Sequence, residues 1–334
     1  MSELISVVVT CFNLERYIGE ALESVLGQLE PGPLEVIVVD DCSTDASREL
    51  VSRYAGVKLL ARKANGGVLN AMLDGVDVAS GDVICLLDGD DRWRPNKIAT
   101  LRRAFADREV AFFTHDVEFI GRDGQNLPIA SRPHAVLANL PARERGEMVR
   151  TGILEHLDYV WLGSAMAFRR SLVDWPGFEA FAANLPDARN TYQDWPLAFW
   201  IAVRPGIRMA YVDEPLFSYR LHGANYSGDA STLASAARNF RRTRNTIAAM
   251  LEIARERGCS RSVRILGKHL AFTEGQLALY EGRRGAAVSG YAHAFTHLAR
   301  RGLLPRELAR LAAGVLLGPA GLVRLVNRSR VRAR

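Results

Sequence analysis

Short apolar runs alternate with amphipathic stretches along about the first 120 residues of the chain. This alternation is typical of strand–helix–strand units, which build a largely parallel sheet. The runs are rich in Val, Ile and Leu, as expected for strands that helices cover on both faces. The predicted strands are Ile5–Thr10, Glu35–Val39, Val57–Ala61, Val83–Leu87 and Val110–Thr114. The predicted helices between them are Tyr17–Leu26, Asp45–Tyr54, Val68–Val78 and Pro95–Ala106.

The remainder of the chain divides into an irregular stretch and a helical end. Residues 119–142 are polar and rich in Gly and Pro, so we expect a long loop or an irregular insertion that borders an acceptor site. After it, short strands are predicted at Ser164–Phe168 and Met209–Val212, and a helix at Asp194–Ala202. Four further helices are predicted at Leu233–Arg257, Val263–Glu281, Ala286–Arg300 and Pro305–Val326. We therefore expect an α/β domain at 1–228, with a mostly parallel sheet flanked by helices, and a helical C-terminal region with a basic tail at 229–334.

Composition and the distribution of charge indicate which kind of partner the protein binds. With 48% apolar and 24% charged residues, the chain has the composition of a globular protein. The net charge of +6 is concentrated between Arg301 and Arg334, where eight arginines face the single acid Glu307. A neutral body with a basic, leucine-rich tail favours an anionic membrane surface over nucleic acid. The uncharged stretch Leu311–Val323 is too short to span a bilayer, and the alternative for it is a helix packed on the body.

The cysteines and the N-terminus bear on localisation. Cys11, Cys42, Cys85 and Cys259 are scattered, without the spacing of a disulfide framework, which favours a reducing cytosol. The apolar run Ile5–Val9 follows no basic segment and is too short for a signal-peptide core. We therefore expect a cytoplasmic protein that associates peripherally with the inner face of the cell membrane.

A cluster of carboxylates ends the predicted strand Val83–Leu87. The turn contains Asp88, Gly89, Asp90 and Asp91. A buried strand that ends in like charges requires a counter-cation, because desolvation and mutual repulsion both oppose ionisation. Carboxylate oxygens in this pattern suit Mg²⁺ or Mn²⁺ that bridges phosphates, and Gly89 permits the tight turn. The alternative is a solvated acidic turn in which Asp91 caps the helix that begins near Pro95.

Polar residues also follow three other predicted strands. Open parallel sheets bind ligands at the carboxyl ends of their strands, so these residues are candidates for a common site. A carboxylate of Asp40-Asp41 can accept from the imide N–H of a base. The segment Asn65–Gly67 precedes a helix with flexible backbone amides that suit a phosphate or a sugar. The first strand ends in Thr10-Cys11-Phe12-Asn13.

In their order and spacing, these segments resemble the family 2 glycosyltransferases of the GT-A (Rossmann-like) fold. The resemblance rests on Ser6–Asn13, Val38–Asp45, Asn65–Gly67, Ala79–Asp82 and Leu87–Asp91, and extends to Gly163–Met166, Gln193–Trp195 and Tyr219–Gly223. It implies that Asp194 is the general base, that Asp90 holds the metal, that Asp88 binds the metal or the ribose, and that His222 completes the metal or diphosphate site. The residues that it implies for the nucleotide sugar are Thr10, Phe12, Asn13, Asp40, Asn65, Gly67, Asp88 and Gly89.

The resemblance also implies the reaction. A metal-dependent, inverting glycosyltransferase would move a sugar from a nucleoside-diphosphate sugar, with UDP or dTDP favoured, to a carbohydrate or lipid-linked acceptor in bacterial cell-surface polysaccharide or glycolipid synthesis. One departure is Gln193, because the family usually has Glu before the catalytic Asp. Without the resemblance, the interpretation of Asp194 would be a helix N-cap, and that of His222 an ordinary loop histidine.

Other classes fit the sequence less well. No GxGxxG motif follows the first strand, and no GxxxxGK[ST] loop occurs, which argues against a dinucleotide-dependent dehydrogenase and a P-loop NTPase. A sugar nucleotidyltransferase would need a Gly-rich basic loop after the first strand, where the chain has Thr10–Leu14. The remaining alternative is a non-catalytic scaffold of the same fold that binds a nucleotide or a glycan.

Overall fold

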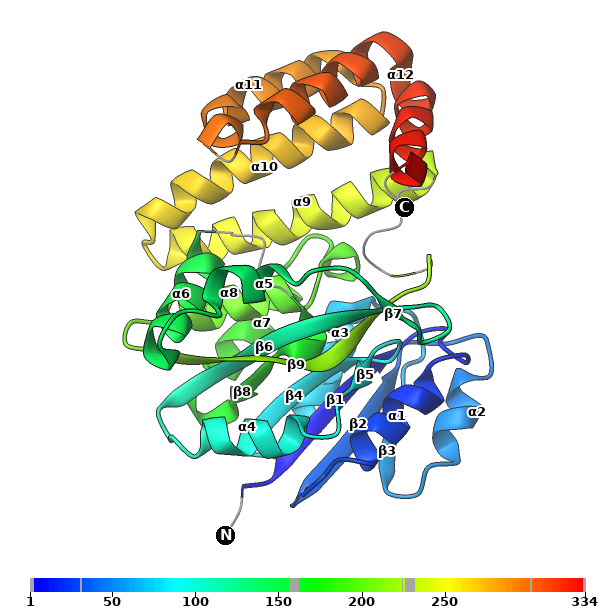
Figure 1. The fold of residues 1–334 in the computed structure, drawn as a ribbon, viewed down its shortest axis with the longest axis vertical. Coiled ribbons are helices and arrows are strands. Elements are labelled where there is room, and N and C mark those ends of the chain that lie inside the picture. Colours follow the sequence, from blue (N-terminus) through cyan, green and yellow to red (C-terminus); the bar gives the residue numbers. More distant parts are fainter. Residues whose placement is uncertain are drawn as a thin grey trace. The chain divides into compact units, whose positions relative to one another are not determined.

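The computed structural model describes residues 3–30, 32–155, 162–223, 225, 232–300 and 302–332. The chain divides into two compact units, Met1–His222 and Gly223–Arg334. The first unit is a mixed α/β fold built on one sheet, and the second unit is helical (Figure 1).

Four parallel strands form one half of the sheet, in the order β3-β2-β1-β4. All seven residues of β1 are buried, as its continuous apolar run predicts for a central strand with both faces covered. The strands are β1 Ile5–Cys11, β2 Leu34–Asp40, β3 Val57–Ala61 and β4 Val83–Asp88. The helices that connect and follow them are α1 Ile18–Leu26, α2 Ser47–Ser52, α3 Val68–Asp77 and α4 Lys97–Phe105.

The other half of the sheet is mixed. After β4 the order continues β8-β6-β9-β5, in which β6 and β9 are parallel and the remaining pairs are antiparallel. The strands are β5 Arg92–Trp93, β6 Val110–Gly121, β7 Asn126–Leu127, which pairs with β6, β8 Ala167–Arg169 and β9 Arg208–Leu221. The predicted α/β class is thus confirmed, with the parallel pairing concentrated around β1.

Of the two alternatives for residues 119–142, the long loop is wrong, because the segment contains short elements of secondary structure. Strand β6 continues to Gly121, and the segment then forms β7 and α5 (Arg132–Leu137) before α6 (Ala142–Leu154) begins. The apolar pattern breaks at His115 and Asp116, but both side chains are buried and bonded, so the strand passes through them. Burial with a partner removes the cost that polar groups otherwise impose on a strand interior.

Strand β9 is also longer than predicted. It passes through Pro215, where its register against β6 shifts, and such an irregularity accommodates a residue that has no N–H to donate. Helix α7 (Trp175–Ala183) was not predicted, although Asp174 caps it by accepting from the Gly177 amide. The remaining elements are α8 Asp194–Ala202 and the short 3₁₀ turns Gly163–Ala165, Arg170–Leu172 and Ala188–Asn190.

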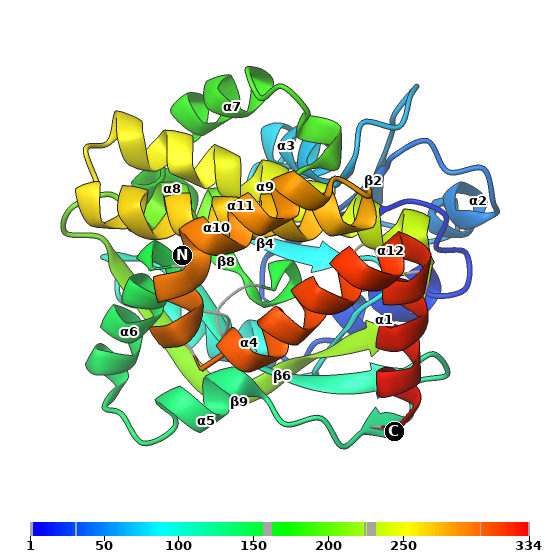
Figure 2. The same ribbon diagram turned by 90° about the horizontal axis from the view of Figure 1, so that it is seen from above.

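The helical unit contains the four predicted helices. In Figure 1 α10 lies between α9 and α11, and Figure 2 shows the helices of this unit from above. Glycines bring α10 and α11 close together, since a Cβ on Gly290 would lie 2.5 Å from the Ala271 carbonyl oxygen. The helices are α9 Leu233–Glu256, α10 Ser260–Tyr280, α11 Arg284–Arg300 and α12 Leu304–Arg332.

Helix α12 differs from the short apolar stretch expected from the sequence. Its segment Leu304–Val326 is long and apolar enough to cross a membrane by length and composition alone, which is weak evidence for a span. The backbone at Gly318 is not helical (φ 70°, ψ 179°) and Pro319 follows, so the helix is kinked there. Leu316 and Leu317, directly before the kink, are 78% and 58% exposed.

Candidate active site

The register of the parallel strands brings three predicted site residues to one edge of the sheet. Thr10 in β1 pairs with Asp88 in β4, and its neighbour Cys11 pairs with Asp40 in β2. The Thr10 hydroxyl donates to Asp88 Oδ1 over 3.1 Å. Residues that lie 30 to 80 positions apart in the sequence therefore meet, because the carboxyl ends of parallel strands coincide.

Asp88 lies beside Gln193 and Asp194 from the start of α8. Gln193 Nε2 donates to Asp88 Oδ1 over 2.7 Å. Gly163 lies against all three residues. A Cβ there would be 3.0 Å from Gln193 Nε2, 3.5 Å from Asp88 Oδ2 and 3.8 Å from Asp194 Cβ. Any larger residue at Gly163 would fill the space between the two carboxylates.

Burial and like charge both act on Asp88. Desolvation, followed by the charges of Asp90 and Asp194, raises the pKa of Asp88 to about 7, although bonds from Thr10 and Gln193 oppose the shift. A carboxyl in this situation is stabilised in its charged form by a cation.

Asp90 lies beside His222. The distance from His222 Nε2 to Asp90 Oδ2 is 3.0 Å, and the His222 ring lies 4.7 Å from the Tyr17 ring, centroid to centroid. Arg220 Nε donates to the Asp90 carbonyl oxygen over 2.9 Å, which fixes the backbone of the turn. Two carboxylates suit Mg²⁺ or Mn²⁺, and the added imidazole is a ligand that Mg²⁺ takes less readily, so the chemistry of Asp88, Asp90 and His222 fits Mn²⁺ better than Mg²⁺. Among the described residues, the ligand atoms of these three side chains do not all lie within 4.8 Å of one another.

Asp91 does not cap the next helix, so that alternative is wrong. Helix α4 begins at Lys97 with Asn96 as its N-cap. The buried Asp91 carboxylate instead accepts from the Ser164 hydroxyl over 2.6 Å and from the Arg220 amide over 3.0 Å. Burial, with the charges of Asp90 and Asp88, raises its pKa well above the usual value. Asp91 therefore joins the acidic turn to the residues on either side of it.

A buried lysine beneath this turn was missed by the sequence analysis. Lys97 Nζ donates to the Ser164 carbonyl oxygen over 2.5 Å, lies 2.9 Å from His115 Nε2, and sits 4.3 Å from the centroid of the Trp93 ring. Burial lowers the pKa of Lys97 to about 7. In the sequence, Lys97 looks like an ordinary polar residue in the first turn of a helix, and only the tertiary fold shows it to be buried.

Asp40 has one engaged and one unpartnered oxygen. Its Oδ2 accepts from Arg48 Nε over 3.1 Å, from Arg48 Nη2 over 2.8 Å and from the Ser43 amide over 3.2 Å. Its Oδ1 is buried and has no hydrogen-bond partner within the described part of the chain. The side chain is therefore held in place with one acceptor left over. The role of Arg48 was not predicted.

The glycines after β3 are engaged by Asp41. The amides of Gly66 and Gly67 each donate to the Asp41 carboxylate over 2.8 Å, and Asn65 Nδ2 donates to its carbonyl oxygen over 3.2 Å. Gly67 has a positive φ of 84°, and a Cβ there would lie 2.2 Å from the Arg189 carbonyl oxygen. The predicted contact of Asn65 and Gly67 with a phosphate or sugar thus competes with a bond inside the protein, and it stays a prediction.

The loop after β1 joins the loop after β2. Asn13 adopts a positive φ of 54°, and its Oδ1 accepts from the Thr44 amide over 2.8 Å. Phe12, next to it, is 46% exposed. Gly89 in the acidic turn is required by close approach, since a Cβ there would lie 2.9 Å from the Thr10 carbonyl oxygen.

Asp194 is the first residue of α8 and not its N-cap, which is Gln193. Its Oδ1 accepts from the Trp195 amide over 3.0 Å. Burial raises the pKa of Asp194 to about 6, against the effect of nearby backbone amides. A carboxylate with a pKa close to neutrality is well suited to accept a proton.

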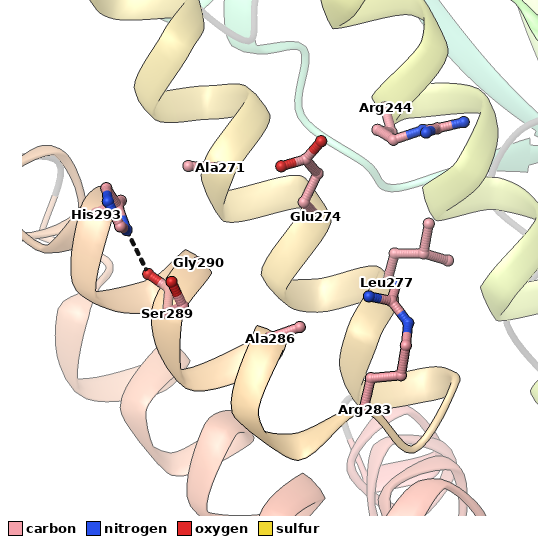
Figure 3. A pocket seen from close by; sticks show the side chains of 9 residues that line it. All are labelled: Arg244, Ala271, Glu274, Leu277, Arg283, Ala286, Ser289, Gly290 and His293. Carbon is pink, nitrogen blue, oxygen red and sulfur yellow. Dashed lines mark hydrogen bonds between the residues drawn. The ribbon is translucent and has the colours of Figure 1, made fainter.

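A separate cavity of about 540 Å³ lies within the helical unit (Figure 3). It includes no predicted site residue and only one acid, Glu274, so it lacks the paired carboxylates of the sheet edge. Its lining consists of Arg244, Ala271, Glu274, Leu277, Arg283, Ala286, Ser289, Gly290 and His293.

The sequence of the chain is similar to a known protein family and to individual relatives in it. Residues 6–173 match the family model described as "Glycosyl transferase family 2". An uncharacterised glycosyltransferase of Nostoc sp. is 28% identical over 241 residues, which cover 69% of each chain. The Escherichia coli protein WfaP, named a UDP-Glc:alpha-D-GlcNAc-diphosphoundecaprenol beta-1,3-glucosyltransferase, is 29% identical over 133 residues, which cover 39% of this chain and 52% of WfaP.

Solved structures are similar in fold. Staphylococcus aureus TarS, in complex with UDP-GlcNAc, has a TM-score of 0.54 at 15% identity and is matched over 90% of this chain and 92% of its own. The mannosyltransferase PcManGT of Pyrobaculum calidifontis, in complex with GDP-Man and Mn²⁺, has a TM-score of 0.53 at 17% identity, over 97% and 86% of the two chains. At these identities the likeness concerns the fold.

Proposed function

Because the chain belongs to glycosyl transferase family 2, we propose that it is an inverting glycosyltransferase that moves a sugar from a nucleoside-diphosphate sugar to an acceptor hydroxyl in bacterial cell-surface polysaccharide or glycolipid synthesis. The observation that carries the proposal is the convergence of Asp88 and Asp194 around Gly163, with Asp90 and His222 beside them. A metal-binding pair and a base close to one another are what a single displacement requires.

Asp40 is proposed to recognise the base of the donor. Its buried Oδ1 lacks a partner, and an unmade hydrogen bond at a buried acceptor is costly, so a ligand N–H that fills it gains affinity. The imide N–H of uracil or thymine and the N1–H of guanine are suitable donors. Cytosine presents a lone pair at the equivalent nitrogen, which a carboxylate repels. UDP and dTDP donors remain the favoured candidates.

Asp88, Asp90 and His222 are proposed to hold Mg²⁺ or Mn²⁺. The like charges of Asp88 and Asp90 raise the pKa of Asp88, and a divalent cation relieves that repulsion. When bound, the ion would neutralise the charge that develops on the departing nucleoside diphosphate. The protein residues fix the ligands in advance, since Arg220 and Ser164 restrain the acidic turn from two sides.

Asp194 is proposed to take the proton of the acceptor hydroxyl. Burial brings its pKa to about 6, so it is largely ionised at neutral pH and still basic enough to accept a proton during attack. Gln193, which stands where the family usually has Glu, donates to Asp88 and adds no further negative charge. The proton acceptor and the metal-binding carboxylates thus have separate roles on either side of Gly163.

The acceptor is proposed to be a carbohydrate or a lipid-linked sugar, met at the inner face of the cell membrane. Helix α12 presents the exposed Leu316 and Leu317 beside its kink, in a segment whose sequence ends in basic residues. We expect binding to vesicles that contain anionic lipid, and weaker binding for the double variant Leu316→Asp/Leu317→Asp in a sedimentation assay. Equal sedimentation of the two proteins would contradict the membrane role.

Calorimetry provides the first test of the donor site. UDP, dTDP, GDP and CDP are titrated into the protein with Mn²⁺ and again with a chelator. We expect metal-dependent binding of one nucleotide and no binding of CDP. The variant Asp40→Leu should lose this binding, while Asp194→Asn should keep it. Binding of no nucleotide, or equal binding with the chelator, would favour a non-catalytic scaffold of the same fold.

A further inference from the structure

A second group of metal-ligating side chains lies away from the acidic turn. Asp116 in β6, His134 in α5 and Asp213 in β9 each offer one ligand atom, and these atoms all lie within 4.8 Å of one another. Within the described ranges, no other set of three His, Cys, Asp or Glu side chains meets this distance. His134 Nδ1 is 2.9 Å from Asp213 Oδ1, and Asp116 accepts a hydrogen bond from the Ser131 hydroxyl.

A buried phenol provides an independent indication of a ligand. Tyr211 is only 4% exposed, and its hydroxyl is buried without a hydrogen-bond partner within the described part of the chain. The hydroxyl lies close enough to Asp116 and Asp213 for both carboxylates to act on it, and Asp213 is within reach of a hydrogen bond, although no bond of regular geometry forms. A buried O–H beside two carboxylates can therefore donate to a species that bridges them.

This group is separate from the catalytic turn. Asp213 lies near the middle of β9, and His222 lies nine residues further on, just beyond the end of this strand. A regular strand of this length spans about 30 Å. The register of β6 against β9 shifts between His115 and Asp116. Such irregularities turn a side chain away from its regular direction in the strand. Asp116 therefore has a local reason to face Asp213.

We propose that Asp116, His134 and Asp213 form a second metal site, which takes Zn²⁺ and leaves one position for a water molecule that bonds to the Tyr211 hydroxyl. One imidazole nitrogen and two carboxylates are a donor set that zinc accepts, whereas Mg²⁺ and Ca²⁺ prefer oxygen alone. The three ligands come from β6, α5 and β9, so the ion would tie the segment after β6 to the sheet. This site does not depend on the proposed glycosyl transfer.

The test uses the full chain, stripped of metal, in an Asp90→Asn background that weakens the catalytic site. Zn²⁺ is titrated by calorimetry, and Co²⁺ is added as a spectroscopic probe. We expect one bound ion with micromolar or tighter affinity, visible d–d absorption of Co²⁺, and a higher melting temperature with Zn²⁺. His134→Ala and Asp213→Asn should weaken binding at least about tenfold, because loss of a ligand costs no less than loss of its outer partner.

Glu214→Gln is the matched control, because Glu214 is an exposed acid next to Asp213 and outside the group of ligands. It should bind Zn²⁺ as the Asp90→Asn protein does. His134 is 60% exposed, so its replacement leaves the core intact and a folded variant is expected. Unchanged Zn²⁺ affinity in His134→Ala and Asp213→Asn, or no binding in the Asp90→Asn background, would overturn the proposal and leave His134 and Asp213 as a simple ion pair.

Discussion

The carboxylates after β2 and those after β4 look alike in the sequence but have opposite surroundings. Asp40 is paired with Arg48, and Asp41 accepts from two glycine amides and lies 3.3 Å from Arg62. Burial raises the pKa of Asp41, and every further charge that acts on it lowers that pKa. At the end of β4, burial raises the pKa of Asp88 and neighbouring acids raise it further.

The two sets of acids differ in what balances their charge. The protein itself neutralises the acids after β2, so they serve as fixed acceptors that shape the site. The acids after β4 repel one another, and the hydrogen bonds that they accept do not offset this repulsion and their burial, so a cation would stabilise their ionised form further. Acidic residues at the ends of two neighbouring strands therefore have different roles. Those after β2 form a rigid part of the site, and the ionisation of those after β4 depends on a bound cation.

The largest effect is expected at Asp194, which lies beside the acidic turn after β4. Asp194→Asn removes the proposed base but keeps its size and its bond from the Trp195 amide. Turnover should fall about 10²–10⁴-fold, with little change in donor affinity. Steady-state kinetics with calorimetry on the same protein measure both quantities. Full turnover in this variant would remove Asp194 from the mechanism.

The pH dependence of turnover should follow the same residue. Asp194 acts as a carboxylate, and burial raises its pKa to about 6, so the active form is lost as the pH falls through that value. Below pH 6, turnover at saturating substrate should decrease about tenfold per pH unit. The residual activity of Asp194→Asn should lack this decrease. A wild-type profile that stays flat down to pH 4.5 would contradict the assignment.

Removal of the cation after β2 should destabilise the fold. Arg48→Ala leaves the buried Asp40 carboxylate with the Ser43 amide as its remaining partner at Oδ2, and the melting temperature should fall by about 2–5 °C. Arg53→Ala is the control, because its ion pair with Glu49 is exposed on both sides and contributes little. An equal decrease in melting temperature in the two variants would mean that Arg48 does not stabilise the buried Asp40 carboxylate.

Neutralisation of an acid after β4 should raise the melting temperature, in contrast to Arg48→Ala, and this change should be the smallest of those predicted here. The folded protein raises the pKa of Asp88 above its value in the unfolded chain, so ionised Asp88 costs stability, and this cost grows as the pH rises from about 4 to 7. Asp88→Asn should therefore raise the metal-free melting temperature by about 1–3 °C at pH 8. The gain should shrink as the pH falls towards 4 and disappear below about pH 3, where Asp88 is protonated in both states. A loss at pH 8 would contradict the comparison.

The sequence predicted the parts of the fold that follow from one local pattern. The strands Ile5–Cys11, Leu34–Asp40, Val57–Ala61 and Val83–Asp88 match the predictions within one residue at each end, because each is a continuous apolar run. The expectation that helices cover both faces fails for β3, which lies at the edge of the sheet and has no buried residue. Helix α6 escaped prediction because its buried face includes Gly146 and Gly152, which lack the apolar side chains that reveal a helical period. Gly146 is needed there, since a Cβ would lie 2.0 Å from the Met209 carbonyl oxygen.

The sequence also predicted only part of the candidate site. Thr10, Asp40 and Asp88 could be grouped from the sequence, because strand ends coincide in a parallel sheet. The contacts of Arg48 and Lys97 could not, because they depend on side chains meeting across helices whose orientation no local pattern specifies. Asp91 was expected to cap a helix and instead bonds to Ser164, a residue 73 positions away.

Strand β9 carries residues of both groups of acids and histidines, with Asp213 near its middle and His222 just beyond its end. Because side chains alternate between the two faces of a strand, deletion of a single residue between these positions would turn every later side chain to the opposite face. Changes in chain length should therefore be tolerated in the turn 122–125 and rejected within 214–219. Among natural homologues, length variation is expected to concentrate in the first of these segments.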